Sequence, residues 1–313
     1  MYLKNTHFFG WINTFLFGTD FFVIRVGLYR MEPKRQVRIA LWITPRSLST
    51  AFLKCMSTFE KAQLFQEPFF TAKMFGPERT VIIPQFDSIF ENLPDVKNYT
   101  YEHVKNTLEM DYPGKDLVFT KDGAKAIYGR FECIPQGYQH VFLIRKPSKV
   151  HVSVEKLRAT AQGIGVDKAS FYNKDQKCLP GSPYRNLLEL LEHVRDVLGQ
   201  KPVVIDADDL TISPGTILKK FCGIVGLEYS ESMLKWKPGP DPRWRRAESV
   251  QSLFAGMTDA HNNSYSSTGF TTRAPGTGTE TPFSELSDEV RKLVEDSTPY
   301  YEKLAAMKIK IED

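Results

Sequence analysis

The segment VRIALWITPRSLSTAF, residues 37–52, changes character in its middle. Its first seven residues are apolar except for Arg38 and are rich in β-branched side chains, which predicts a buried strand over 37–43. Beyond its midpoint, apolar side chains recur at helical spacing, at Leu48, Ala51, Phe52, Cys55 and Phe59. The segment therefore predicts a strand that passes into a helix through a short loop at 44–50.

This loop combines one cation with several hydroxyl groups. Arg46 follows the proline that ends the strand, and the hydroxyls of Ser47, Ser49 and Thr50 come next. The first turn of a helix has backbone N–H groups without intrahelical partners and carries partial positive charge. These groups together predict a seat for a phosphate or a sulfate. An ordinary βα turn with a capping serine is the alternative, and the absence of GxxxxGK[ST] argues against a standard nucleoside-triphosphate site.

Four more apolar runs predict strands over 63–66, 117–120, 140–145 and 202–206. Helical patterns separate several of them: apolar side chains at 184, 187, 188, 191, 194 and 198 form one face, Ser213-Pro214 begins a helix that Gly226 ends, and 285–305 is a last amphipathic helix. This alternation predicts parallel βαβ units, and hence a three-layer α/β/α domain with a central, mostly parallel sheet. The stretch 236–282, rich in Pro, Gly, Ser and Thr, is predicted as a long loop region. Ligands of such sheets bind at the carboxyl ends of the strands.

A second strand end also carries groups that suit a phosphate. In HVFLIRKPSKVHVSV, residues 140–154, Arg145 stands where the strand stops and Pro147 suits the first turn of the following helix. Ser153 comes one or two turns into that helix. A guanidinium can direct two donors at a phosphate, and the serine adds a hydroxyl. The alternative is a surface arginine and an ordinary helix serine.

The two strand ends together resemble the cofactor signatures of sulfotransferases that use 3′-phosphoadenosine 5′-phosphosulfate (PAPS). TPRSLSTA at 44–51 is similar to their 5′-phosphosulfate loop, and IRKP-(x)5-S at 144–153 is similar to their 3′-phosphate site. The resemblance covers about residues 36–240 and implies a P-loop-like sulfotransferase fold, PAPS as co-substrate, adenosine 3′,5′-bisphosphate (PAP) as product, and no metal. It implies that Arg46 holds the 5′-phosphosulfate, with donors from Ser47, Leu48, Ser49 and Thr50, and that Arg145 and Ser153 hold the 3′-phosphate. The cytosolic branch of the family usually has Lys where this chain has Arg46, so the chain looks closer to a divergent branch.

A hydroxyl that attacks sulfur must lose its proton to a base. Glu67 follows the second predicted strand, and its spacing from Arg46 resembles that of sulfotransferases whose base is a glutamate. The cytosolic branch has a catalytic His two residues after a Lys at the third strand end. This chain has Lys121 but Gly123. That departure favours Glu67 as the base and leaves Lys121 to stabilise charge on the transferring group; a solvated glutamate and a solvent lysine are the alternatives.

Other stretches give less definite expectations. His103 and His151 are alternative bases. Asp208 and Asp209 are expected to be structural, with capping a helix or orienting the site as the alternative. The stretch 266–270, with Arg273 after it, is a candidate to close over the nucleotide, and the basic, aromatic 236–246 is expected either to line an acceptor pocket or to be a solvated loop.

The bulk composition limits the class of ligand and the compartment. The 313 residues carry a net charge of +4, which suits an anionic ligand but argues against nucleic acid as a partner. Four cysteines without CxxC spacing indicate thiols rather than a disulfide framework or a zinc site. The expected domains are an N-terminal extension, 1–34, and a sulfotransferase domain, 35–313. Membrane association is expected only through the mostly apolar 8–24, so the predicted location is cytoplasmic, with a Golgi anchor as the alternative.

The expected function is transfer of a sulfuryl group from PAPS to a hydroxyl of a small molecule or carbohydrate. Two alternatives remain at this point: a nucleotide kinase-like phosphotransferase, and a non-enzymatic protein that binds an adenosine phosphate. The sequence names neither the acceptor nor the oligomeric state.

Overall fold

The computed structural model describes residues 36–79, 91–161, 179–257, 262–272, 274 and 280–311. Residues 36–313 form one compact unit. The predicted N-terminal extension, including 8–24, lies outside the described residues, so its role stays a prediction. Within the part of the chain that is described, no helix has both the length and the apolar character needed to cross a bilayer.

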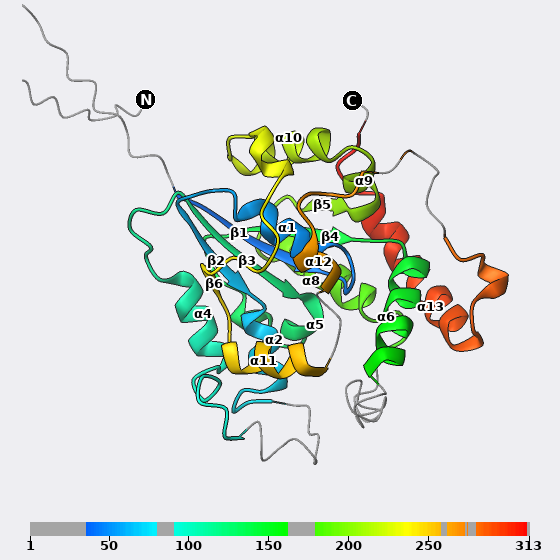
Figure 1. Ribbon diagram of the computed structural model, residues 1–313, viewed down its shortest axis with the longest axis horizontal. Helices are drawn as coiled ribbons and strands as arrows, with labels where there is room; N and C mark the ends of the chain where they lie inside the picture. Colours follow the sequence, from blue (N-terminus) through cyan, green and yellow to red (C-terminus); the bar gives the residue numbers. More distant parts are fainter. Residues whose placement is uncertain are drawn as a thin grey trace, which may run out of the picture. The chain divides into compact units, whose positions relative to one another are not determined.

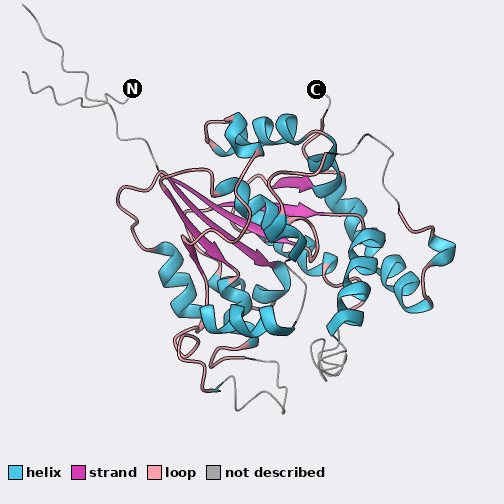
Figure 2. Cartoon of the chain, viewed as in Figure 1, coloured by secondary structure: helices cyan, strands magenta, loops and turns pink. Residues whose placement is uncertain are grey.

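The centre of the unit is a six-stranded sheet, in which every neighbouring pair runs parallel (Figures 1 and 2). Its strands are β1 (Val37–Ile43), β2 (Ala62–Gln66), β3 (Leu117–Gly123), β4 (Gln139–Ile144), β5 (Val203–Asp206) and β6 (Trp244–Arg245), in the order β5-β4-β1-β3-β2-β6. Crossover connections that contain the helices join the parallel strands, so the carboxyl ends of all the strands lie at the same edge of the sheet. The predicted α/β class with a parallel central sheet is therefore confirmed.

Alternating side chains of the strands enter two separate hydrophobic cores, as the period of a strand dictates. Ile39, Leu41 and Ile43 of β1 pack under the helices of one layer, α1 (Ser49–Met56), α9 (Ala207–Ile212) and α10 (Pro214–Val225). Ala40 and Trp42 face the other layer, which contains α2 (Pro68–Met74), α4 (Tyr101–Glu109), α5 (Ala124–Ile127), α6 (Pro147–Ala161), α8 (Tyr184–Asp196) and α13 (Asp288–Ala305). The remaining elements are the 3-10 turns η1 (Phe131–Cys133), η3 (Glu231–Leu234) and η4 (Phe283–Glu285), and the helices α11 (Glu248–Met257) and α12 (Asn262–Ser266).

All five predicted strands are present, and their bounds differ from the predicted ones by no more than a few residues. The helix that begins at Pro214 ends as predicted, because Gly226 takes the left-handed conformation at φ 77°. Ser213 occupies the N-cap position, but its hydroxyl donates to the hydroxyl of Thr216 at 2.9 Å instead of accepting from the backbone. Leu198, predicted on the apolar face of α8, lies beyond the helix and is 41% exposed.

The prediction of a long loop region over 236–282 is wrong in part. This stretch contains β6, α11 and α12. The two residues of β6 are too few for a periodic signal, and Gly and Ser in and around the helices hide their weak amphipathic pattern. Tertiary contacts with β2 and α1 supply the order that local sequence did not indicate.

Candidate active site

The loop between β1 and α1 holds two residues in a conformation that non-glycine residues rarely adopt. Arg46 has φ 60° and Leu48 has φ 66°. The hydroxyl of Ser47 donates to the carbonyl oxygen of Thr44 at 2.7 Å, which closes the turn. Leu48 is the N-cap residue of α1 and offers no side-chain oxygen to the first turn, which also has no acidic residue. The loop therefore presents the N-terminus of α1 without a side-chain cap, in the form that suits an anion.

The two predicted cofactor segments contact one another directly. Nε of Arg46 donates to Oγ of Ser153, on α6, at 3.0 Å. In the opposite direction, Nη1 of Arg145 donates to the carbonyl oxygen of Arg46 at 2.9 Å. Arg145 thus braces the loop at its left-handed residue, and the guanidinium of Arg46 extends toward α6. The predicted grouping of Arg46, Arg145 and Ser153 at one sheet edge is found in the structure.

Arg145 also has a carboxylate and a second cation beside it. Its Nε lies 3.9 Å from Oδ1 of Asp208, and Nζ of Lys149 lies 2.9 Å from Oδ2 of the same residue. The hydroxyl of Tyr184 donates to the carbonyl oxygen of Arg145 at 2.5 Å. Asp208 therefore lies beside both of these cations, and its role in orienting the site stays a prediction. Asp209, by contrast, pairs with Lys308 at 2.6 Å, a structural role as expected.

The end of β5 fixes Asp208 in turn. Asp206 is the N-cap of α9, and its Oδ1 accepts from the backbone N–H of Asp208 at 2.9 Å. Its Oδ2 accepts from the hydroxyl of Tyr301, on α13, at 2.8 Å. The site's β4 side thus comprises Arg46, Arg145, Lys149, Ser153 and Asp208, which come from the β1–α1 loop, the end of β4, α6 and α9.

On the other side of β1, Glu67 and Lys121 form an ion pair. Nζ of Lys121 lies 2.6 Å from Oε1 of Glu67; the lysine side chain is 1% exposed and the glutamate side chain 20%. Lys121 is therefore not a solvent lysine. Glu67 follows β2, takes the left-handed conformation at φ 54°, and donates its backbone N–H to the carbonyl oxygen of Lys121 at 2.8 Å. A strained backbone at the end of a strand is a common feature of functional positions.

Asp122, which the sequence analysis did not single out, fixes the conformation of Glu67. Its buried carboxylate accepts backbone N–H bonds from Phe69 at 2.6 Å, Phe70 at 3.1 Å and Gly123 at 3.0 Å. These bonds anchor the start of α2, directly after Glu67. Burial raises the pKa of Asp122 well above its usual value, and the charge of Glu67 raises it further. The alternation of side chains along β3 was the signal that could have identified Asp122. It places Asp122 and Lys121 on opposite faces of the sheet, and Asp122 thus stands at a position where an apolar residue is expected. The site's β2/β3 side comprises Glu67, Lys121 and Asp122.

Neither histidine that was considered as a base belongs to these groups. His103 is exposed on α4, where its Nε2 lies 3.4 Å from Oγ1 of Thr107. His151 is buried on α6, and its Nε2 lies 2.9 Å from Oγ of Ser297.

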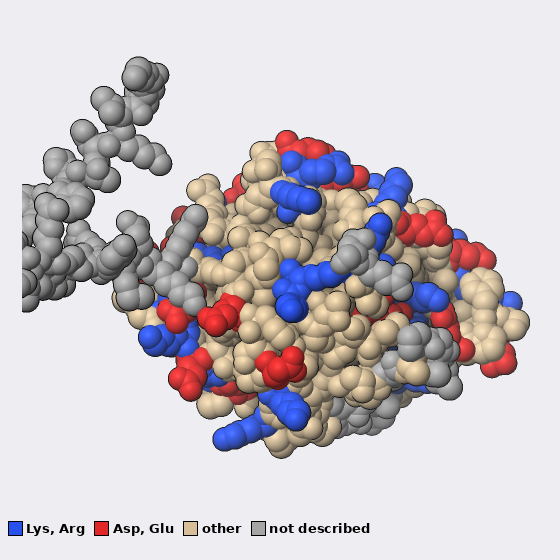
Figure 3. Space-filling view, turned by 90° about the horizontal axis from the view of Figure 1, so that it is seen from above, with Lys and Arg blue, Asp and Glu red and all other residues tan. Residues whose placement is uncertain are grey.

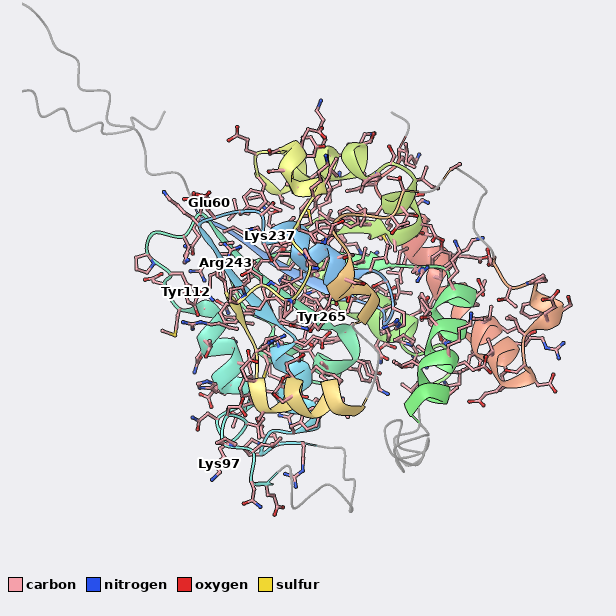
Figure 4. All side chains as sticks on the ribbon, in the orientation of Figure 1. Glu60, Lys97, Tyr112, Lys237, Arg243 and Tyr265 are labelled. Atoms are coloured by element: carbon pink, nitrogen blue, oxygen red, sulfur yellow. The ribbon has the colours of Figure 1, made fainter. Side chains whose placement is uncertain are left out.

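Lys54 holds a distant segment against the loop's helix. Its ammonium donates to the backbone carbonyl oxygens of Ser264, Tyr265 and Ser267, each at 3.0 Å. Burial lowers the pKa of Lys54. Figure 4 labels Tyr265, which lies on α12. The stretch 266–270 thus begins beside residues that are bonded to α1. Arg273 lies outside the described residues. Closure of this stretch over a nucleotide stays a prediction.

Two residues of the basic, aromatic stretch 236–246 attach it to the end of α1. Arg243 donates to the carbonyl oxygens of Phe59 and Glu60 at 2.9 and 3.1 Å, beside the C-terminal end of α1 (Figure 4). Trp244 is buried in β6, 3% exposed, and its Nε1 donates to Oγ of Ser57 at 2.8 Å. These two residues attach the sheet edge to α1 and are not part of a solvated loop, whereas an acceptor pocket lined by the stretch stays a prediction.

Among the described residues, the side chains that commonly bind metal ions are not grouped into a metal site. The described ranges contain no group of three His, Cys, Asp or Glu side chains placed to hold a metal ion. Cys55, Cys133 and Cys222 are free thiols, and Cys178 lies outside those ranges.

Comparison with known proteins gives distant likenesses. No protein-family model matches the chain. Among solved structures, the sulfotransferase domain from the curacin biosynthetic pathway is 14% identical and has a TM-score of 0.45, over 84% of this chain and 98% of that one. A sulfotransferase from Alicyclobacillus acidocaldarius is 14% identical, with a TM-score of 0.43 over 71% and 91% of the two chains. Retinol dehydratase, in a complex with retinol and PAP, is 12% identical, with a TM-score of 0.41 over 87% and 82%.

Two curated plant proteins match by sequence. The branched-chain-amino-acid aminotransferase-like proteins 2 and 1 of Arabidopsis thaliana are 25% and 27% identical over 224 and 207 residues. The match covers 65% and 64% of this chain but only 32% of either plant protein. The chain thus spans about a third of the length of the curated relatives that it matches, and their name does not carry over to it.

Proposed function

We propose that the chain is a PAPS-dependent sulfotransferase that moves a sulfuryl group to a hydroxyl of a small molecule or carbohydrate. One observation carries the proposal. A cation-rich group around Arg46, Arg145 and Ser153 shares its sheet edge with the buried Glu67–Lys121 pair. The first group suits phosphates, and the second suits proton transfer beside developing negative charge.

The donor set fits a ligand with two separate anionic ends. The loop at 44–50 and the uncapped N-terminus of α1 would hold the 5′-phosphosulfate, with donors from Ser47, Leu48, Ser49 and Thr50. Arg145 and Ser153 would hold the 3′-phosphate. Arg46 lies between the two seats, since its backbone belongs to the loop and its side chain reaches Ser153.

Glu67 would act as the general base. PAPS supplies an activated sulfuryl group, joined to its 5′-phosphate through a bridging oxygen. As the acceptor oxygen forms its bond to sulfur and the bond from sulfur to the bridging oxygen breaks, the acceptor proton passes to the carboxylate of Glu67. An ammonium 2.6 Å away favours an ionised carboxylate, the form that can accept a proton.

Lys121 would stabilise the charge that develops during transfer. Its side chain is buried on the face of the sheet that α1 covers. The side chains of Val118 and Thr120 lie on the opposite face, since side chains alternate along β3. A fixed cation in a site without much water acts more strongly than a solvated one. Together with Arg46 it provides the positive charge that many phosphoryl transferases obtain from Mg²⁺.

The surface charge agrees with a small anionic ligand. On the face that Figure 3 shows, Lys and Arg side chains lie among Asp and Glu side chains. A surface of mixed sign differs from the continuous basic stripe that is typical of nucleic-acid binding.

Incubation of the full chain with ³⁵S-labelled PAPS and a panel of phenols, sterols, sugars and aliphatic alcohols tests the proposal. We expect labelled product and PAP to form in equal amounts with at least one acceptor class, without added metal. Magnesium-dependent turnover of ATP in place of PAPS would support a kinase-like protein instead. Tight binding of PAP without turnover on any acceptor would support a non-enzymatic adenosine-phosphate-binding protein.

A further inference from the structure

Lys149 lies on the β4 side of the site but is not part of either cofactor signature. It is the fourth residue after Arg145 and the fourth before Ser153. Residues four apart on a helix are neighbours on its surface, so Lys149 and Ser153 lie side by side on α6. Both therefore stand on the face of α6 that meets the loop, next to Arg145.

We infer that Lys149 is a second cation of the 3′-phosphate seat, beside Arg145, and that Asp208 is the positioning residue that holds it there. The inference rests on the proposed function. Lys149 reaches Asp208 at 2.9 Å, and Arg145 lies 3.9 Å from the same carboxylate. The carboxylate of Asp208 thus lies beside both cations, which are four residues apart in the sequence.

The charges of this group suit a phosphate monoester. Arg145 and Lys149 bring two positive charges to the seat, and Asp208 brings one negative charge. The neighbouring Lys146 is paired with Glu280 at 3.1 Å and adds no net charge. A terminal phosphate carries about −1.5 to −2 at pH 7, so Lys149 brings the charge of the seat closer to the complement of its ligand. On the β2/β3 side, by contrast, Lys121 and Glu67 cancel.

Asp208 is itself held rigidly enough to serve as an anchor. Its backbone N–H is bonded to Asp206, which Tyr301 also holds. The side chains of Arg145, Lys149 and Asp208 are about one-fifth exposed, at 19%, 19% and 23%. A ligand can therefore reach them, yet they are shielded enough for their charges to act strongly. An ammonium has three donors and a guanidinium has five, so both can bind a phosphate without leaving Asp208.

Two ligands that differ only in the 3′-phosphate test the inference without any acceptor. Binding of PAP and of adenosine 5′-monophosphate to the full chain is measured by calorimetry for the wild type, Lys149→Met, Asp208→Ala and Lys308→Met. Lys308→Met is the matched control, because it removes a lysine that pairs with the next aspartate of α9. We expect Lys149→Met to weaken PAP binding by roughly tenfold to a hundredfold, the effect of losing one bond to a charged group. Binding of the monophosphate should change less than about threefold.

Asp208→Ala should lower the preference for PAP by a smaller factor, because the cations stay but lose their alignment. Lys308→Met should leave both affinities as in the wild type. An unchanged preference for PAP in Lys149→Met, or equal loss of both ligands, would overturn the role of Lys149. Tighter PAP binding in Asp208→Ala would overturn the positioning role, since Asp208 would then only compete with phosphate. A wild type that does not prefer PAP would contradict the proposed function as well.

Discussion

The two sides of the site differ in their balance of charge. The β4 side has three cations, Arg46, Arg145 and Lys149, and the last two lie beside one carboxylate, Asp208. The β2/β3 side has one cation, Lys121, which is paired with Glu67, and a separate buried carboxyl group, that of Asp122. Strand β1 and its loop lie between these sides in the sheet order.

Under the proposed function, this difference would separate cofactor binding from chemistry. A surplus of cations holds phosphate groups that keep their charge throughout the reaction, so the β4 side should govern cofactor affinity. A balanced pair can exchange a proton and respond to changing charge, so the β2/β3 side should govern turnover. Variants of Arg145 and Lys149 should therefore affect mainly KM, and variants of Glu67 and Lys121 mainly kcat.

Removing the base should have the largest effect. Glu67→Gln keeps the size of the side chain but removes its proton affinity, so we expect kcat to fall by about 10²- to 10⁴-fold. The affinity for PAP, measured by calorimetry, should stay within about threefold of the wild type. Full turnover in this variant would show that the proton leaves by another route.

Removing Arg145 should have the complementary effect. We expect Arg145→Ala to raise the KM for PAPS by roughly tenfold to a hundredfold, because a charged hydrogen bond to phosphate contributes about 1.5–3 kcal/mol. The kcat at saturating PAPS should change much less. Arg195→Ala is a suitable control, since Arg195 is exposed and pairs only with its neighbour Asp196 within the described contacts. An unchanged KM in Arg145→Ala would contradict the division between the two sides.

Asp122 tests whether the β2/β3 side depends on its buried anchor. In Asp122→Asn one acceptor oxygen becomes an amide that meets the N–H of Phe69, so a donor faces a donor. We expect a loss of about 1–3 kcal/mol in the free energy of unfolding, measured with urea, and a fall of about tenfold in kcat as Glu67 loses its conformation. PAP affinity should be retained; a variant with normal kcat would show that α2 holds Glu67 unaided.

The smallest expected effect concerns a buried imidazole near the start of β4, that of His140. Nδ1 of His140 accepts from Nε1 of Trp42 at 3.0 Å, and burial, with a smaller effect of His193, lowers the pKa of His140 from 6.5 to about 4. The unfolded chain then binds a proton below pH 6.5 that the folded protein does not bind until about pH 4. Stability should therefore fall as the pH decreases, by about 2 kcal/mol between pH 8 and pH 5.

Urea unfolding of the wild type and of His140→Gln at several pH values measures this effect. Gln keeps an acceptor for Trp42 but does not titrate, so the difference between the two slopes isolates the imidazole. Asp122 contributes to the pH dependence of stability with the opposite sign, because its pKa is raised. It contributes equally in both proteins, so its contribution cancels in the difference. Identical slopes would mean that the folded protein also protonates His140 in this range.

Much of the fold followed from local patterns. The strand at 37–43, the turn at Arg46 and the helix at 214–225 were each indicated by features within a few residues, namely apolar runs, a proline and a capping glycine. Strand β6 could not be predicted in this way, because two residues have no period and depend on pairing with β2. Leu198 failed for a related reason: the apolar pattern continues, but the chain leaves the helix.

For the site, the sequence determined the chemical groups and the strand ends that carry them. Arg46, Glu67, Lys121 and Arg145 were all predictable, because strands and turns are local and parallel strands must end at one edge. The tertiary structure alone decided which groups meet. Residues 53 to 107 positions apart are joined by the Glu67–Lys121 pair, the contact between Arg46 and Ser153, the bond from Phe69 to Asp122 and the pair of Lys149 with Asp208. Such contacts depend on strand order and on packing, which short-range sequence patterns do not indicate.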